Sequence, residues 1–403
     1  MKYDFTTVLN RAGHDAVAYD GLGLLSMTPP KPTREGFDAI PMWTADMNFH
    51  VFPGIQEAIA KRLQEPHFGY FLKSREYFDA IVGWNKERNG AVELTSECVG
   101  HENGLLGGLN SALNVICTRG DHVLIHSPTY SGFTRSIEQN GYHLVHSELK
   151  PDENGVWRMD FEDMEKKIVT HRIHAMVFCT PHNPCGRVWE RWEVDQMMAL
   201  CKKHDVYVVA DEIWSDIIRP DCKHVPPELV SEDAKMRTVA LYSTAKTFSI
   251  PGLTGSYHII YNKALRDQIE KEASRTNYNE INLFTMHAVV GAYSAEGARW
   301  VDEMCQTIDT NMNYACDYVT KHFEGVEFFH PEGTYMLYLD CTKWCQAHGK
   351  TIEDVNQAGW DVGVAWRDGR QYRSPCHVRI CVAHPLSKLQ EAFDRMDKYV
   401  FNA

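Results

Sequence analysis

The sequence predicts an α/β protein, in which a large domain with a mainly parallel sheet is followed by a smaller α+β domain. Between about residues 95 and 262, short apolar runs alternate with helical stretches, which is typical of successive βαβ units. Beyond about residue 290 the pattern changes. The 403 residues also suggest two or three domains at about 150 residues each. We therefore expect an N-terminal arm over 1–45 that packs with the small domain, a large domain over 46–290 and a small domain over 291–403.

Short apolar runs mark the expected strands of the large domain. A helix is predicted over 193–203, because apolar residues such as Val194 and Met198 recur there at helix spacing. In the C-terminal part, a helical stretch over about 284–322 precedes the strand-like segments GTYMLYLD and HVRICV. The expected strands of the large domain are 122–126, 173–179, 206–210, 239–242 and 257–261.

The composition is that of an ordinary globular protein, with 44% hydrophobic and 24% charged residues, which excludes a disordered chain. The 41 Lys and Arg residues against 54 Asp and Glu residues give a net charge of −13, so nucleic acid is not an expected partner. The N-terminus lacks an apolar signal stretch, and no apolar run approaches the ~20 residues that span a bilayer. We expect a cytoplasmic protein with no membrane partner.

The 12 cysteines are scattered from Cys98 to Cys381 without a CxxC pair. This pattern predicts reduced, mostly buried thiols rather than a disulfide framework. His171 and His174 have a spacing that occurs in metal sites, but they lead into a strand-like segment and no HExxH helix is near. We expect no bound metal.

Polar or aromatic residues follow four of the predicted strands directly. In an open parallel sheet, ligands bind outside the carboxyl ends of the strands, where such residues converge. The segments SPTYSGF, TPHNPCG, DEIW and STAKT provide, in order, Tyr130, Asn183, Asp211, and Ser243 with Lys246. The sequence therefore predicts a functional site at this edge of the sheet.

Two of these residues have a specific chemistry. A lysine in a turn is commonly exposed to solvent, but a desolvated amine such as that of Lys246 is nucleophilic and forms a Schiff base with an aldehyde. Asp211 follows an apolar strand, where a pyridinium N–H would stabilise its carboxylate by about 1.5–3 kcal/mol. Asp211 could equally cap a helix.

The remaining residues fit other parts of one ligand. The amide of Asn183 could donate to a phenolate oxygen, although Asn is also common in turns for local reasons. Tyr130 could lie against a flat ring or simply pack. A helix start, with its free N–H groups, suits a phosphate, and several weak contacts must converge there. The candidates are Gly104, Leu105, Leu106 and Ser243.

Together these groups match pyridoxal 5'-phosphate. The segments SPTYSGF, TPHNPCGRVW, VVADEIW and YSTAKTFSIPGLTGSY resemble, in order and spacing, those of the fold-type-I pyridoxal phosphate enzymes of the class I/II aminotransferase superfamily. Within that superfamily, PMWTADMNF, HFGYF and KTFSIPGLTGSY are most similar to bacterial cystathionine β-lyases of the MalY/PatB type. The resemblance extends from about residue 3 to residue 399 and implies a PLP-dependent transferase-like large domain.

The resemblance also implies a role for each matching residue at the cofactor. Lys246 would form the Schiff base, Asp211 would bond the pyridine nitrogen, and Asn183 would donate to the ring oxygen. Tyr130 would stack on the ring, and Trp214 is a candidate second donor to the ring oxygen. The phosphate would be held by Gly104, Leu105, Leu106 and Ser243, with Tyr70 reaching in from a second subunit.

On the substrate side, the resemblance implies that Arg379 grips the α-carboxylate through a bidentate fork, for which lysine would be a poor substitute. Trp43 and Ala45 are further candidates for binding the substrate. Trp43, Trp366 and Tyr335 could line its side-chain pocket, or each could equally be a core residue. The family forms homodimers with shared active sites, so a homodimer is expected here.

The sequence departs from the family pattern at three positions. Trp214 stands where relatives usually have Tyr or His, so its indole N–H either donates to the ring oxygen or that contact is absent. Thr254 replaces the phosphate-binding Arg of most aminotransferases, as is frequent in the lyase group. Asn48 replaces the more usual Asp on the substrate side. These positions affect which reaction occurs rather than whether the cofactor binds.

The predicted reaction is α,β-elimination of cystathionine or a related L-cysteine S-conjugate to a thiol, pyruvate and ammonia. Thr254 and the lyase-like segments favour this reaction over transamination, which is the main alternative. Racemisation of an amino acid and a non-catalytic regulatory relative are also compatible with the sequence. Retention of both Lys246 and Asp211 argues against the last.

Overall fold

The computed structural model describes residues 1–24 and 28–402 and packs into two compact units. The first unit comprises Met1–His50, Asn183–Gly186 and Glu303–Ala403, and the second comprises Val51–His182 and Arg187–Asp302. The boundary between them falls within helix α12 (Ala295–His322). The division at residues 45 and 290 remains a prediction about folding domains, whereas these units describe how the residues pack.

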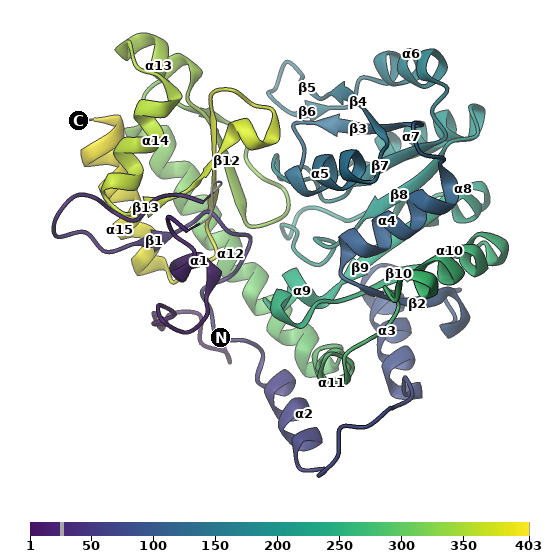
Figure 1. Ribbon diagram of the computed structural model, residues 1–403. Helices are drawn as coiled ribbons and strands as arrows, with labels where there is room; N and C mark the ends of the chain where they lie inside the picture. The colour runs from purple at the N-terminus through teal and green to yellow at the C-terminus, as the bar shows by residue number, and fades with distance from the viewer. Residues whose placement is uncertain (25–27, 403) are drawn as a thin grey trace. The chain divides into compact units, whose positions relative to one another are not determined.

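A mixed, mostly parallel sheet forms the centre of the second unit, as predicted (Figure 1). Its order, within the described residues, is β2-β10-β9-β8-β7-β3-β4. The strands are β2 (Val99–Asn103), β3 (His122–Ser127), β4 (His143–Glu148), β7 (Ala175–Cys179), β8 (Tyr207–Asp211), β9 (Thr238–Ser243) and β10 (Gly255–Ile259). The five predicted strands are therefore all present, with shifted ends.

One of the predicted strands, β10, runs antiparallel to both of its neighbours, β2 and β9, so the sheet is not purely parallel. The connection from Ser243 to Gly255 is too short for the crossover of a dozen or more residues that a parallel pair needs. The chain therefore turns back after the two short helical turns Thr244–Thr247 and Pro251–Leu253.

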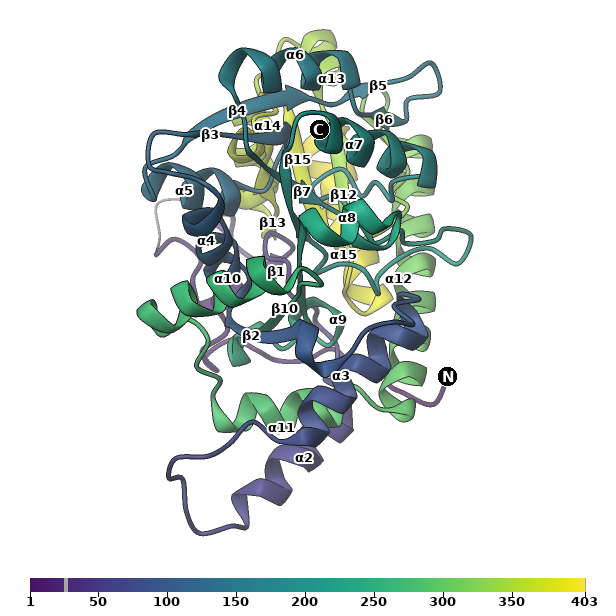
Figure 2. The same cartoon turned by 90° about the vertical axis from the view of Figure 1, so that its right-hand side faces the viewer.

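Helices cover both faces of this sheet, which explains why its central strands are continuous apolar runs. On one face, Leu113, Ile137 and Ile269 pack with Val177 and other strand residues. On the other face, Cys201 meets Met176, with the two sulfur atoms 3.5 Å apart. Figure 2 shows α4 and α5 on one side of the sheet and α7 and α8 on the other. The helices are α4 (Leu105–Ile116), α5 (Ser131–Gln139), α6 (Phe161–His171), α7 (Arg191–Lys203), α8 (Glu232–Arg237), α9 (Thr244–Thr247) and α10 (Lys263–Thr276).

Three more helices lie together at the β2 edge of the sheet (Figure 1): α2 (Pro53–Leu63), α3 (Arg75–Arg88) and α11 (Leu283–Ala292). The sequence predicted one helical stretch over 284–322, but α11 ends at Ala292 and α12 begins at Ala295. The break occurs because the Ser294 hydroxyl accepts the backbone N–H of Gly297 at 3.1 Å, as a helix-capping residue does. The short strands β5 (Lys150–Pro151) and β6 (Trp157–Arg158) pair separately.

The first unit contains an antiparallel sheet in the order β11-β12-β15-β14, within the described residues. The predicted strands in GTYMLYLD and HVRICV are β12 and β15. The N-terminal arm joins this unit through parallel pairing of β1 with β13. The strands of the first unit are β1 (Ile40–Pro41), β11 (Glu327–Phe328), β12 (Met336–Asp340), β13 (Val364–Ala365), β14 (Arg367–Asp368) and β15 (His377–Cys381). Helices that lie wholly in this unit include α1 (Val17–Asp20), α13 (Thr342–His348), α14 (Ile352–Asp361) and α15 (Leu386–Met396).

The cysteines are free thiols, and eight of the 12 are buried, all of them in the described part of the chain. Across residues 1–24 and 28–402, no helix combines the length and the apolar character needed to cross a bilayer.

Candidate active site

Lys246 and Asp211 lie at the ends of adjacent strands in the second unit. Asp211 is the last residue of β8, which pairs in parallel with β9. Lys246 lies in the single turn of α9, which begins directly after β9. That turn starts there because the Ser243 hydroxyl accepts the backbone N–H of Ala245 at 3.1 Å. Local capping therefore positions the lysine one turn beyond the strand end.

The lysine and Trp214 are brought together in the same unit. The Lys246 Nζ atom lies 6.0 Å from the centroid of the Trp214 ring, and the tryptophan is buried. A cation over an indole face at this distance is stabilised by about 0.5–2 kcal/mol. Trp214 therefore interacts with the lysine amine, which is a contact that the sequence did not predict. Whether its indole N–H reaches a ring oxygen remains a prediction.

Asp211 is a buried carboxylate in need of a positive partner. Burial raises the pKa of this carboxyl to about 7, against the backbone N–H of Ile213 and the charge of Lys246, which both lower it. The Ile213 N–H donates to Oδ1 at 3.1 Å. A pyridinium N–H bonded to the carboxylate would restore the ionised form, because an opposite charge in contact favours it. The site therefore fits the predicted cofactor ring.

The predicted phosphate contacts at the start of α4 are not equivalent. The Gly104 N–H donates to the carbonyl oxygens of Glu102 (3.0 Å) and Thr254 (3.2 Å). The first hydrogen bonds within the helix are donated to the Gly104 carbonyl by Gly107 and Gly108. The N–H groups of the intervening Leu105 and Leu106 precede this ladder, so they are the ones suited to an anion.

Ser243 is also engaged locally. Besides capping α9, its hydroxyl donates to the Gly255 carbonyl. A phosphate contact from Ser243, or from the Gly104 N–H, would have to replace these bonds, and both stay predictions. Thr254 has a left-handed φ of 49° and contributes its carbonyl, not a positive charge, to the same region.

Tyr130 is the residue before α5, and its ring is held edge-on to Phe133 with centroids 5.3 Å apart. A Cβ on Gly132 would lie 2.3 Å from the Tyr130 ring, so a glycine is needed there. The tyrosine is half-buried. Its ring position is thus set by its own helix start, and its stacking on a cofactor remains a prediction.

Arg379 and Asn183 meet in the first unit. On β15, the Arg379 Nη1 atom donates to Asn183 Oδ1 at 3.0 Å, and Nη2 donates to the Trp43 carbonyl at 2.9 Å. Because Oδ1 faces the guanidinium, the amide is oriented so that its NH₂ group is available as a donor. Arg379 is 3% exposed, and its Nε has no hydrogen-bond partner among the described residues. An unpaired buried donor is costly, so this arginine fits a bound carboxylate.

Trp43 opens the segment that also holds Ala45 and Asn48. The Trp43 indole donates to the Ala18 carbonyl at 3.0 Å, so the ring anchors this segment to the arm. Ala45 is half-buried in the same segment. The departure at Asn48 is used structurally, since its Oδ1 accepts from Arg11 at 3.1 Å. Trp366 and Tyr335 are fully buried, as expected of core residues.

Arg11 is a residue that the sequence did not reveal. Its guanidinium contacts the Asp46 carboxylate at 2.5 Å and the Met47 carbonyl at 3.0 Å, so it holds the segment that contains Ala45. No local pattern could have indicated it, because its partners are 35 or more residues away. Arg379 also lies over the Tyr372 ring, 4.9 Å from its centroid, a contact without a sequence signal.

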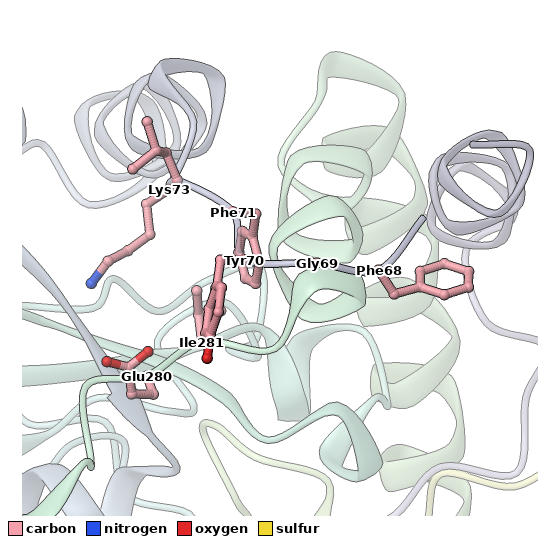
Figure 3. A pocket seen from close by; sticks show the side chains of 8 residues that line it. Phe68, Gly69, Tyr70, Phe71, Lys73, Glu280 and Ile281 are labelled. Carbon is pink, nitrogen blue, oxygen red and sulfur yellow. The ribbon is translucent and has the colours of Figure 1, made fainter. Parts of the chain in front are cut away.

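Tyr70 is apart from the other predicted residues of the second unit. It lies on the loop between α2 and α3 and is fully exposed. A hollow of about 580 Å³ is lined by Phe68–Lys73 together with Glu280 and Ile281. Figure 3 shows Tyr70 among these lining residues. Within the chain it therefore does not join the residues at the strand ends.

Known proteins resemble this chain over most of its length. Residues 50–396 match the family model of class I and II aminotransferases. Cystathionine beta-lyase PatB of Bacillus subtilis is 33% identical over 348 residues, which are 86% of each chain.

Solved structures of PLP-bound enzymes also resemble this chain over nearly its whole length. A PLP-bound putative aminotransferase from Clostridium difficile has a TM-score of 0.89 at 28% identity, covering 98% of this chain and 99% of that one. A PLP-bound C-S lyase from Staphylococcus hominis has a TM-score of 0.88 at 28% identity over 98% of both. The family predicted from the motifs is confirmed, and this chain belongs to the class I and II aminotransferase family.

Proposed function

We propose that this chain is a pyridoxal-phosphate-dependent carbon–sulfur β-lyase. It would convert cystathionine, or a related L-cysteine S-conjugate, and one water molecule to a thiol, pyruvate and ammonia. The observation that carries the proposal is the similarity to a cystathionine beta-lyase over 86% of the chain. The placement of Lys246 and Asp211 at neighbouring strand ends supports it.

The cofactor is pyridoxal 5'-phosphate, and residues of the second unit would hold it. Lys246 would bond its aldehyde carbon and Asp211 its pyridine nitrogen. The N–H groups of Leu105 and Leu106 would meet the phosphate, and Tyr130 would lie against the ring. In the first unit, the amide of Asn183 would donate to the ring oxygen.

The chemistry divides between the cofactor and the chain. When bound, pyridoxal phosphate withdraws electrons from the substrate α-carbon, which allows a proton and then a thiolate to leave. Once the substrate amine has replaced Lys246 on the aldehyde carbon, the freed Lys246 would accept the α-proton at Nζ, and Trp214 would keep that amine in place through ring contact. Asp211 holds a proton on the pyridine nitrogen. Arg379 binds the α-carboxylate, with Trp43 and Ala45 beside it.

Elimination and transamination differ in what they consume. A lyase forms pyruvate from cystathionine over many turnovers without a keto-acid acceptor, whereas a transaminase stops after one equivalent of cofactor is used. We expect continued pyruvate formation, measured with a coupled lactate dehydrogenase assay. Lys246→Ala is the control, and it should lose both the visible cofactor band and the activity. Pyruvate that stops at one equivalent would contradict the lyase.

Transamination of an amino acid is the second candidate. It is favoured by the family model and by the putative aminotransferase among the similar structures. Thr254 argues against it, since that position provides a carbonyl rather than an arginine side chain.

We further propose a homodimer in which Tyr70 reaches the phosphate of the second subunit. The loop between α2 and α3 supports this, because Phe68, Tyr70 and Leu72 are all exposed on it. Single exposed apolar residues are normal, but contiguous ones mark interfaces. We also propose a cytoplasmic location, with which 12 free thiols agree, because reducing compartments keep cysteines unpaired.

A further inference from the structure

A buried cluster of polar residues adjoins Asp211 in the second unit. Glu212 follows Asp211, and Tyr242 precedes Ser243 at the end of β9. Glu228 lies in the short helix η2 (Pro227–Leu229) and His224 in the loop before it. All four side chains of the cluster are buried, with Glu212 and Glu228 at 0% and 1% exposure. None of them was singled out by the sequence, and the proposed mechanism does not use them.

The tyrosine hydroxyl links the two glutamates. Tyr242 Oη lies 2.8 Å from Glu212 Oε2 and 2.9 Å from Glu228 Oε1. His224 Nε2 lies 2.7 Å from the same Glu212 oxygen. These distances are hydrogen-bond distances, so each of the three contacts contains a proton.

The number of protons that these contacts need shows how many of the two glutamates must be protonated. Tyr242 has a single hydroxyl proton, which fills one of its two contacts. A carboxylate has no proton to donate, so the other contact requires a protonated glutamate. The contact with His224 is filled either from the imidazole or from Glu212. In every arrangement, at least one of the two glutamates is a carboxylic acid.

Glu228 is the better place for that proton. Glu212 Oε2 is approached by the hydroxyl of Tyr242 and the imidazole of His224, whereas Tyr242 is the neutral donor that approaches Glu228 Oε1, so Glu212 is the stronger acceptor. Glu228 Oε2 is buried without a hydrogen-bond partner among the described residues, which disfavours a charge there.

The charges around the cluster also favour a proton on Glu228. Burial raises the pKa of Glu228 well above its usual range, and the neighbouring Glu212 adds to this effect. Burial also raises the pKa of Glu212. His224 offers no counter-charge, because burial lowers its pKa to about 4. The groups that act on the cluster from the elements around it are acidic: Asp211 on β8, Asp216, Tyr257 on β10 and Tyr261.

We propose that Glu228 is held as a neutral carboxylic acid and is a positioning residue, which donates to Tyr242 and through it to Glu212. This hydrogen-bonded chain ties the ends of β8 and β9, the two strands that carry Asp211 and Lys246. Protonation of Glu228 also removes one negative charge from the neighbourhood of Asp211. This favours the ionised form of Asp211, because like charges in a low dielectric disfavour each other. Only the consequence for Asp211 rests on the proposed function.

The protonation of Glu228 is testable without any activity. Infrared spectra of the full chain at neutral pH should show a protonated carboxylic acid band that Glu228→Gln lacks. The folded state keeps a proton that unfolded Glu228 releases above its ordinary pKa of about 4.5. The melting temperature of the wild type should therefore fall relative to that of Glu228→Gln as the pH rises from about 4.5 towards 8. Identical spectra and parallel pH curves would overturn the proposal.

The positioning role is tested with the cofactor bound. Glu228→Gln keeps a neutral donor to Tyr242, so the pH midpoint of the visible cofactor band should stay within a few tenths of a unit. Tyr242→Phe cuts both glutamate contacts at the same side-chain size, and we expect its midpoint to move by about one pH unit or more. An unmoved midpoint in Tyr242→Phe would refute the role. Failure to bind pyridoxal phosphate at all would refute the proposed function instead and leave the infrared result standing.

Discussion

Arg379 shows how one buried side chain can serve two purposes. Two of its nitrogen atoms hold Asn183 and the Trp43 carbonyl, and Nε finds no hydrogen-bond partner in the part of the chain that the structure describes. The planar guanidinium makes these contacts in a fixed geometry that a single ammonium cannot reproduce. The arginine therefore orders its own unit while keeping a donor for a carboxylate.

Arg379→Lys should weaken substrate binding. Loss of one charge-assisted hydrogen bond, at about 1.5–3 kcal/mol, predicts a fall in kcat/KM of roughly 10–150-fold, mainly through KM. Steady-state pyruvate formation measures it. Arg373→Lys, at an exposed position, is the control and should leave both constants unchanged. An unchanged KM in Arg379→Lys would rule out the carboxylate role.

Asp211 makes the cofactor-free protein sensitive to pH. Burial raises its pKa to about 7 from 3.8, so the folded state retains a proton that the unfolded state releases. Its contribution to stability is present below about pH 4 and is lost as the pH rises towards 7, a loss of roughly 4 kcal/mol. Urea unfolding at a series of pH values measures this decline. Asp211→Asn should remove it, and a decline that persists in Asp211→Asn must come from other groups.

At the scale of elements, α2 and α11 approach each other closely through glycine. A Cβ on Gly291 of α11 would lie 2.5 Å from the Gly54 carbonyl oxygen and 2.8 Å from the Ala58 Cβ. The loop that carries Tyr70 begins where α2 ends. The packing of this helix pair therefore sets where that loop starts.

Gly291→Ala should force the two helices apart at a cost of about 1–3 kcal/mol. Thermal or urea unfolding measures the loss. Gly83→Ala is the matched control, because a Cβ there meets nothing within 4 Å in the middle of α3. Gly83→Ala should be neutral or stabilising by up to about 1 kcal/mol, since alanine is the better helix former. Equal effects of the two substitutions would show that the helix contact is not tight.

For the molecule as a whole, the exposed loop between α2 and α3 is the surface on which the proposed dimer can be tested by mutation. Leu72 is 89% exposed and lies beside Tyr70 and Phe71. Such a surface is costly in water and would be covered in the proposed dimer.

Leu72→Glu should raise the dimer dissociation constant by about tenfold or more, because it buries a charge in an apolar contact. Analytical ultracentrifugation over a concentration series measures it. Val169→Glu, at an exposed position of α6 with 59% exposure, is the control and should leave association unchanged. A wild-type chain that sediments as a monomer at all concentrations would refute the dimer.

Much of the fold could be predicted from local sequence patterns. The central strands β3, β7, β8 and β9 are apolar on both faces, so their positions could be predicted from short apolar runs. Asp211 is the last residue of β8, and Tyr130 and Lys246 lie three residues beyond the ends of β3 and β9, so all three are close to a strand end in the sequence. The break between α11 and α12 was missed, because one serine hydroxyl decides it and the apolar pattern continues across it.

Local sequence patterns were enough to predict the α/β class, the order of the central strands along the chain and the chemistry of the residues at their ends, because these depend on neighbours within a few positions. Only the tertiary structure decided that Arg11 holds the segment around Asp46, that Arg379 meets Asn183, and that Glu228 shares a hydroxyl with Glu212. These pairs are separated by 16 to 196 residues, with contacts that no local spacing encodes. They arise because the fold excludes water from those places, and a buried polar group must then find whatever partner the topology brings within reach.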